Sequence, residues 1–294
     1  MTKERQLLHD RYGALLGKVT AWAAANENID GVMIVGSQTR SHLPADAWSD
    51  LDVLIAAQNR EPLFARDDWL HAFGALKLLF NEATMVPGIT ERRALYDDGG
   101  VGLDVDFTIF PTEALPLAAP AAGAVLKRGY RIVVDKLGAL ETFAASAGEL
   151  PSEPLDEGTW HNALADTLYH VVWAAKKLRR GERFVAKQST DGYLKRELLK
   201  RLEWQAAGNG TPLWHDGRFL ALWADAPTVN GLPSAFALYE DASIAQALRA
   251  TLDLYTRLAR AVAGQHGFTY PDESEEFSRL ALGRCLAPWD GAST

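Results

Sequence analysis

The sequence predicts an α+β protein of two domains, with a mixed sheet flanked by helices to about residue 150 and an all-helical bundle over 151–294. Three observations predict this fold. Short apolar runs and strand-like alternation are confined to the first half of the 294 residues, and the second half shows successive helical patterns. Between the halves, residues 144–158 combine small residues with two prolines. The chain is long enough for each domain to bury its own core.

The first half begins with a helix and two strands. Residues 3–25 repeat apolar side chains at helical spacing. An apolar strand at 32–35 then ends in a Gly-Ser turn at 36–37, and a polar excursion leads to a second strand that carries Asp50 and Asp52. This strand-turn-strand unit brings a glycine-containing turn and two carboxylates into one short stretch.

The following segments predict one more helix and an antiparallel arrangement of strands. A helix is expected at 61–73 and a short strand at 76–80. A hairpin follows, with one strand ending near Tyr96, a turn at 97–100 and a second strand at 101–110. A last strand at 130–134 completes the domain.

The second half predicts four helices in a bundle. Apolar residues recur at helical spacing in each of them, and the loops between them contain glycine and proline. The helices are expected at 159–180, 187–206, 217–225 and 240–265.

Composition restricts the class of protein and of partner. The hydrophobic content of 48% and the absence of a long unbroken apolar tract predict a cytoplasmic protein that neither crosses a membrane nor binds one. The single cysteine, Cys285, cannot form an internal disulfide bond. A net charge of -8 argues against nucleic acid and favours a small or cationic partner. The oligomeric state has no signature in the sequence.

The acidic residues of the first half predict a metal site beside a phosphate site. Asp50 and Asp52, two residues apart on a strand, point to one face and could share a cation. On the strand at 101–110, Asp104 and Asp106 lie on the face opposite the apolar side chains and offer a third carboxylate. Three converging carboxylates repel one another unless cations such as Mg²⁺ neutralise them. The bland alternative is the solvated face of a strand.

The second half contributes a basic segment. Between Lys176 and Arg201 ten basic residues stand against three acidic ones, a local net charge of +7. Lys176 and Arg180 share a helix face with Trp173, and Lys187 follows a glycine break, so these side chains could bind a triphosphate. A solvated helix surface explains most of the run equally well.

The motifs together resemble a known family. GSQTRSHLPADAWSDLDV and DVDFTIFP are similar to the DNA polymerase β-like nucleotidyltransferase superfamily, in particular its aminoglycoside 6-adenylyltransferase (streptomycin adenylyltransferase) branch. The similarity continues through WAAKKLRRGE, ELLKRLEW and YPDESEEF and so covers most of the chain. It implies the polymerase β-like form of the predicted α+β domain, with the active site in a cleft completed by the helical domain.

The resemblance also implies roles for particular residues. Gly36 and Ser37 match the turn that contacts the nucleotide phosphates. Asp50 and Asp52 match the paired metal ligands, and Asp106 matches the third carboxylate, as a ligand of a second ion, as a general base, or as both.

Three positions leave alternatives open. Relatives usually have arginine where this chain has Gln38, which leaves Arg40 as a substitute phosphate contact. Asp104 shares the strand face of Asp106, and Glu82 is another candidate for the base. Spacing does not decide among these residues.

The function that the resemblance implies is adenylyl transfer. AMP is expected to pass from Mg²⁺-ATP, with two ions, to a hydroxyl group of a small polar acceptor. The first candidate is a cationic aminoglycoside such as streptomycin, in antibiotic resistance. Alternatives are the same chemistry on a lincosamide, a metabolite or a protein hydroxyl, and a catalytically silent nucleotide-binding module. The sequence does not separate ATP from GTP.

Overall fold

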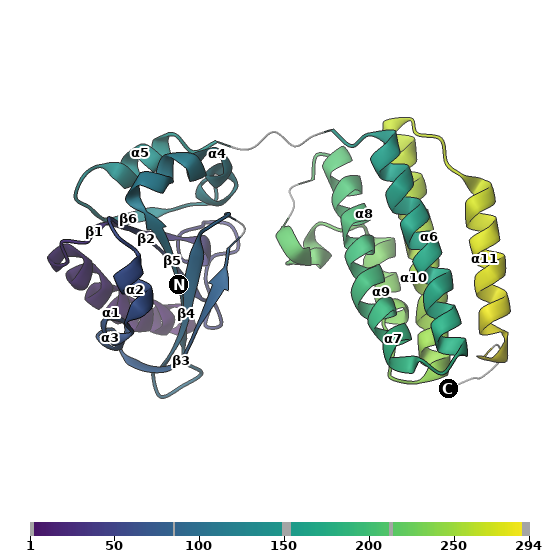
Figure 1. Cartoon of the computed structure of the whole chain (residues 1–294), viewed down its shortest axis with the longest axis horizontal. Helices are drawn as coiled ribbons and strands as arrows, with labels where there is room; N and C mark the ends of the chain where they lie inside the picture. Colours follow the sequence, from purple (N-terminus) through teal and green to yellow (C-terminus); the bar gives the residue numbers. More distant parts are fainter. Residues whose placement is uncertain (1–2, 85, 149–153, 212–213, 290–294) are drawn as a thin grey trace. The chain divides into compact units, whose positions relative to one another are not determined.

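The computed structural model describes residues 3–84, 86–148, 154–211 and 214–289 (Figure 1). The chain divides into two compact units, Met1–Ser152 and Glu153–Thr294. The predicted boundary near residue 150 lies outside the described residues.

The first unit is built on one mixed six-stranded sheet in the order β3-β4-β5-β2-β1-β6. Strands β2 and β5 pair in parallel, and the other neighbours pair antiparallel. The parallel pair lies inside the sheet, where both strands are shielded from solvent. The strands are β1 Ile29–Val35, β2 Leu51–Ala57, β3 Ala75–Ala83, β4 Thr90–Asp97, β5 Leu103–Pro111 and β6 Arg131–Asp135.

Helices cover both faces of this sheet (Figure 1). Apolar side chains of α1, α2 and α3 pack with Val32, Val53 and Phe107 in one core. Helices α4 and α5 pack with Met33 and Leu54 in a second core on the opposite face. Two separate cores explain why β1 and β2 are apolar on both sides. The helices are α1 Lys3–Ala25, α2 Glu61–Ala65, α3 Asp68–His71, α4 Leu115–Leu126 and α5 Ala139–Ala145.

The second unit is a helical bundle arranged around its longest helix, α10. This helix buries apolar residues along its length, and it contacts α6, α8, α9 and α11. The α+β fold with a helical second half, predicted from the sequence, is therefore confirmed. The helices are α6 Glu157–Arg179, α7 Arg183–Gln188, α8 Leu194–Gly208, α9 Ala226–Ala235, α10 Asp241–His266 and α11 Asp272–Leu286.

The single helix predicted at 61–73 is wrong. The chain forms two short helices there, because Arg66 is extended between them. The buried guanidinium of Arg92 donates hydrogen bonds to the carbonyl oxygens of Leu63 and Arg66, at 2.6 and 3.0 Å, and so holds the break. The donor lies on β4, outside any local sequence window.

The helix predicted at 217–225 is also wrong. Phe219 has a φ of 51°, which a regular helix does not allow, and only short 3₁₀ turns form there. The helix starts later, where the Asp225 side chain caps α9 by accepting from the Thr228 amide at 3.0 Å. This Asp-Ala-Pro-Thr start was readable as a helix N-terminus.

Two further features differ from the predicted elements. The helix expected at 187–206 is interrupted by a π-helical turn, Ser189–Tyr193, between α7 and α8. Residues 272–276 form an acidic run that opens α11, where acidic side chains complement the helix dipole. No helix in the described part of the chain is long and apolar enough to span a lipid bilayer.

Candidate active site

The site begins at the turn that follows β1, a single 3₁₀ turn over Gly36–Gln38. Gly36 has a φ of 71°, in the left-handed region that favours glycine. A β-carbon there would lie 2.0 Å from Oδ2 of Asp52. Glycine is therefore required at this position, because its missing side chain is the space that the Asp52 carboxylate occupies.

The same turn fixes the segment that carries Asp50. The Ser37 hydroxyl and the Gln38 side-chain amide donate to the backbone carbonyl oxygen of Asp50, at 3.4 and 3.1 Å. The sequence predicted that Asp50 lies on the second strand, but it lies one residue before β2 begins. Gln38 thus has a structural role in positioning Asp50.

The sheet register brings the third carboxylate to the first two. Asp52 on β2 and Asp106 on β5 are direct partners in the parallel pair. Asp50, Asp52 and Asp106 each offer a carboxylate oxygen within 4.8 Å of the others. Asp104, two residues earlier on β5, is exposed and is not part of this group of three carboxylates.

Asp106 is buried, and its two oxygens differ. Oδ2 accepts a hydrogen bond from Nη2 of Arg93 at 2.5 Å, whereas Oδ1 has no hydrogen-bond partner among the described residues. Burial raises the pKa of Asp106 to about 6, although Arg93 acts to lower it. Arg93 also lies 3.1 Å from Glu91 and 3.4 Å from Glu82. It is the cation that compensates this acidic part of the sheet.

Sequence reasoning did not identify Arg93. It faces Asp106 directly across the β4–β5 hairpin. The register of the hairpin identifies these two residues as partners, but predicting that register requires the length of the turn, which the sequence pattern did not fix.

These residues fit a divalent cation. Asp50, Asp52 and Asp106 each offer a hard oxygen ligand of the kind that Mg²⁺ prefers, and these ligand atoms lie within 4.8 Å of one another. One oxygen of Asp106 has no hydrogen-bond partner among the described residues. Asp50, Asp52 and Asp106 would hold the ion.

The raised pKa of Asp106 predicts a pH-dependent stability for the metal-free protein. The folded protein holds the Asp106 proton up to about pH 6, whereas an unperturbed carboxyl loses it near 3.8, so stability falls as the pH rises between these values. Asp106→Asn removes the free-energy cost of ionising this buried carboxyl in the folded protein. We expect the variant to be more stable than the wild type above pH 6, by about 1–2 kcal/mol.

Urea unfolding with a chelator present, from pH 4 to pH 8, measures this difference. The difference should be much smaller near pH 4, because the wild-type carboxyl is then protonated in the folded state and close to half protonated in the unfolded state. A difference in stability that does not change with pH would contradict the stated cause.

Two other residues singled out from the sequence take different positions. The Arg40 side chain donates through Nε to the carbonyl oxygen of Leu43, within its own loop. Glu82 is exposed on the edge strand β3 and is paired with Arg93. A phosphate contact by Arg40 and a base role for Glu82 stay predictions.

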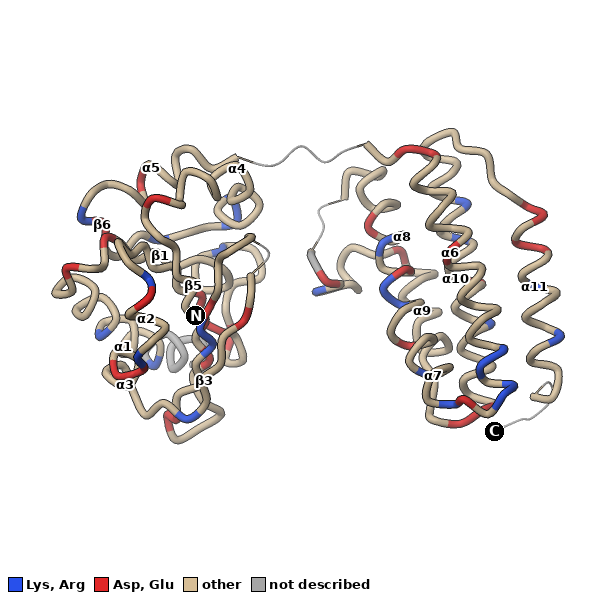
Figure 2. Tube along the Cα trace, in the orientation of Figure 1, with Lys and Arg blue, Asp and Glu red and all other residues tan. Residues whose placement is uncertain are grey.

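The basic segment of the second unit is extensively paired. Figure 2 shows its lysines and arginines beside α7 and along α8. Lys187 forms an ion pair with Asp191, and Arg180 lies 2.7 Å from Glu182. Lys176 is exposed on α6. Nucleotide binding by Lys176, Arg180 and Lys187 stays a prediction.

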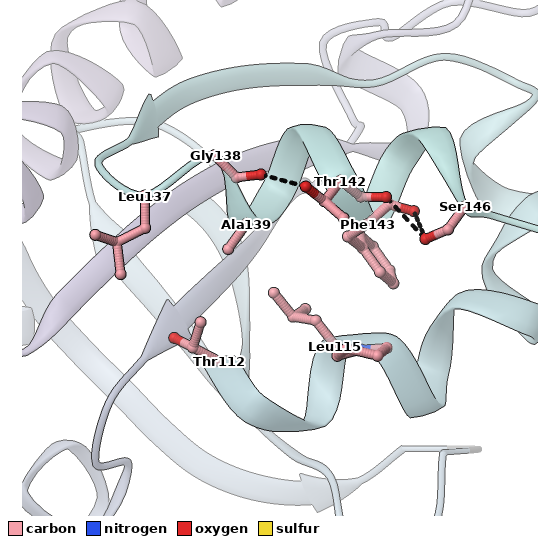
Figure 3. Close-up of a pocket in the computed structure, with 9 residues that line it drawn as sticks. Thr112, Leu115, Leu137, Gly138, Ala139, Thr142, Phe143 and Ser146 are labelled. Atoms are coloured by element: carbon pink, nitrogen blue, oxygen red, sulfur yellow. Dashed lines mark hydrogen bonds between the residues drawn. The ribbon is translucent and has the colours of Figure 1, made fainter.

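A pocket of about 240 Å³ also lies between α4 and α5 (Figure 3). Leu115 and Phe143 point into it. The hydroxyl groups of Thr142 and Ser146 donate hydrogen bonds to backbone carbonyl oxygens of α5 and of its N-cap residue. None of the nine lining residues is charged. The pocket therefore has no carboxylate comparable to those of Asp50, Asp52 and Asp106.

The comparison with protein families agrees with the carboxylate geometry. A family model described as streptomycin adenylyltransferase matches residues 12–280, which is most of the chain and includes the three aspartates. The chain belongs to the streptomycin adenylyltransferase family. Membership of this family makes it a nucleotidyltransferase, which acts with a nucleotide co-substrate and a divalent metal.

Two solved structures align with most of the chain at low sequence identity. An aminoglycoside 6-adenyltransferase from Bacillus subtilis is 15% identical, with a TM-score of 0.44, over 96% of this chain and 98% of the other. A nucleotidyltransferase-like protein from Exiguobacterium sibiricum is 12% identical, with a TM-score of 0.36, over 95% and 90%. No curated protein sequence matches the chain.

Proposed function

We propose that this family member transfers AMP from Mg²⁺-ATP to a hydroxyl group of an aminoglycoside, with streptomycin as the first candidate. The observation that carries the proposal is the convergence of Asp50, Asp52 and Asp106, in which one buried oxygen has no partner among the described residues. The description of the family model, streptomycin adenylyltransferase, supports the choice of acceptor.

The reaction exchanges one bond to the α-phosphorus for another. The acceptor oxygen bonds to the α-phosphorus, the bond from that phosphorus to the bridging oxygen breaks, and pyrophosphate leaves. The acceptor proton passes to a carboxylate. Asp50, Asp52 and Asp106 would hold a divalent cation, which would supply positive charge for the phosphate oxygens.

The chain's own residues supply position and charge. The 3₁₀ turn at Gly36 and Ser37 would present backbone amides to the phosphates, as turns of this kind do. Asp106 would orient or deprotonate the acceptor hydroxyl, while Arg93 holds the other oxygen of the same carboxylate. Preorganised groups of this kind act mainly through orientation and electrostatics.

The overall charge of -8 suits a polycationic acceptor. Acidic groups near the sheet are nevertheless compensated within the unit, since Asp98 pairs with Arg11, and Asp97 lies 3.5 Å from Lys77. The net negative charge of the protein would therefore attract the acceptor, and the paired acids Asp97 and Asp98 would not form a separate acidic patch for it.

An acceptor panel tests the proposal. The protein is incubated with Mg²⁺, an equimolar mixture of ATP and GTP, and separate aminoglycosides, lincosamides and metabolites, and the products are analysed by mass spectrometry. We expect one AMP to be added to streptomycin or another aminoglycoside. Transfer only to a different acceptor class would replace the aminoglycoside, and nucleotide binding without transfer to any acceptor would indicate a silent module.

A further inference from the structure

The edge strand β3 carries an aromatic residue in line with the carboxylate site. Phe80 on β3 is the partner of Arg93 on β4, and Arg93 is the partner of Asp106 on β5. Directly paired residues lie on the same face of a sheet, so Phe80 projects from the face that carries Asp106 and Asp52. Neighbouring strands are about 4.8 Å apart, which places the backbones of Phe80 and Asp106 about 10 Å apart.

Phe80 and Leu78 form an exposed apolar surface, which we call the β3 ledge. Phe80 is 54% exposed, and Leu78, two residues earlier on the same face, is 62% exposed. The second core, which packs α4 and α5 on this face, includes no residue of β3 or β4, and both of these strands are described throughout. In Figure 1, α4 and α5 lie toward β1 and β6, and β3 is the opposite edge of the sheet. The β3 ledge is therefore available to a ligand of this unit.

The same face bears more acids than cations beside the ledge. Within residues 78–82, 91–95 and 104–108, one cation, Arg93, shares this face with four acids. The acids are Glu82, Glu91, Asp104 and Asp106. Nη2 of Arg93 donates to Asp106, whereas Nε lies 3.4 Å from the half-exposed Glu82 carboxylate and forms no hydrogen bond with the described residues. Glu82 is therefore only loosely paired and can accept from a further cation.

A bound metal ion would not remove this negative charge. Glu82, Glu91 and Asp104 all lie outside the group of three aspartates that would hold the ion. The acids beside the ledge therefore favour a cationic ligand and disfavour an anionic one. The exposed ring of Phe80 adds to this selectivity, because an aromatic ring attracts a cation placed over its face. The ledge and the acids thus suit a single ligand that has both an apolar ring and a positive charge.

We propose that Phe80 and Glu82 determine acceptor specificity, by binding a cationic ring of the acceptor against the β3 ledge while its hydroxyl group reaches Asp106. The ring lies on Leu78 and Phe80, and an ammonium or guanidinium group of the acceptor pairs with Glu82. An uncharged acceptor gains nothing from Glu82 and binds more weakly. This inference rests on the proposed function, because it concerns the acceptor of that transfer. It assigns Glu82 to acceptor binding and not to the role of base, which the sequence left open.

Isothermal titration of the full chain with streptomycin, without nucleotide, tests the ledge directly. We expect Phe80→Ala to bind streptomycin about tenfold more weakly than the wild type, because the ligand cation loses the face of the ring. Phe80→Tyr keeps the ring and should bind as the wild type does. Leu117→Ala is the matched control, since Leu117 is 85% exposed on α4 and its truncation also removes an exposed apolar side chain. It should leave the affinity unchanged.

Steady-state kinetics separates acceptor binding from catalysis. Phe80→Ala should raise the KM for the acceptor about tenfold and leave kcat and the KM for ATP unchanged. Glu82→Gln removes one negative charge at nearly constant shape and should raise the acceptor KM about threefold, again with kcat unchanged. A fall in kcat with an unchanged acceptor KM in Glu82→Gln would make Glu82 the base and overturn its assignment to binding.

Equal streptomycin affinity in Phe80→Ala, Glu82→Gln and the wild type, or no binding by the wild type, would overturn the proposal. An exposed edge strand can also pair with a second copy of the chain. Light scattering that shows a wild-type dimer, converted to monomers by Phe80→Ala, would assign the ledge to that copy and overturn the proposal as well. The proposed function is judged separately, by transfer of AMP. Ledge-dependent streptomycin binding without transfer would keep the ledge and remove that function, and transfer with an unchanged acceptor KM in both variants would do the reverse.

Discussion

Asp50→Asn and Asp52→Asn should each lower the rate of pyrophosphate release by at least roughly 10³-fold, because each removes a charged ligand from the phosphate-activating site. Both carboxylates lie within 4.8 Å of Asp106, and asparagine keeps their shape while removing the charge. A coupled pyrophosphate assay with Mg²⁺-ATP and the acceptor measures the effect.

The fold should survive both substitutions, since they reduce repulsion among three carboxylates. Asp68→Asn is the matched control: this acid is exposed on the same unit and pairs with Arg66 at 2.9 Å. It should retain wild-type activity. Turnover by Asp50→Asn or Asp52→Asn at the rate of the control would remove these residues from the mechanism.

Gly36→Ala should lower activity by about 100-fold or more, because the added β-carbon must displace the Asp52 carboxylate. The clash is severe, with 2.0 Å between that carbon and Oδ2 of Asp52 and 2.9 Å to its Cγ. A left-handed backbone adds strain of about 1 kcal/mol for alanine. Steady-state kinetics at saturating Mg²⁺-ATP, together with thermal unfolding, separates the two effects.

Gly99→Ala isolates the contribution of backbone strain. Gly99 has a φ of 79°, close to the 71° of Gly36, but no atom lies within 4 Å of its β-carbon position. We expect it to lose a similar amount of stability and to keep its activity. If the two glycine variants lost activity equally, displacement of Asp52 would not be the cause.

Much of the site was accessible from local patterns. The strand that ends in Gly36 and Ser37, the Asp-x-Asp spacing at 50–52 and the alternation on the strand with Asp106 all express short-range periodicity. That alternation placed Asp104 and Asp106 on the same face, but it did not choose between them. The choice comes from the parallel pairing of β2 with β5, which sets Asp106 directly beside Asp52.

What the sequence did not predict depends on distant contacts. Arg92 breaks the helix expected at 61–73 by binding carbonyl oxygens more than twenty residues away. Arg93 compensates Asp106 only because the hairpin register makes them neighbours. The role of Gln38 is likewise a hydrogen bond to the Asp50 backbone, which a comparison of residue types alone interprets as a lost phosphate contact.

The most direct test of the central claim follows the fate of each phosphorus atom of ATP. The protein is incubated with Mg²⁺ and the acceptor found in the panel, using ATP labelled at the α-phosphorus in one reaction and at the γ-phosphorus in another. Nucleotidyl transfer predicts that the α label appears on the acceptor and the γ label in pyrophosphate, with neither product formed by Asp52→Asn. A γ label on the acceptor would show phosphoryl transfer and contradict the account.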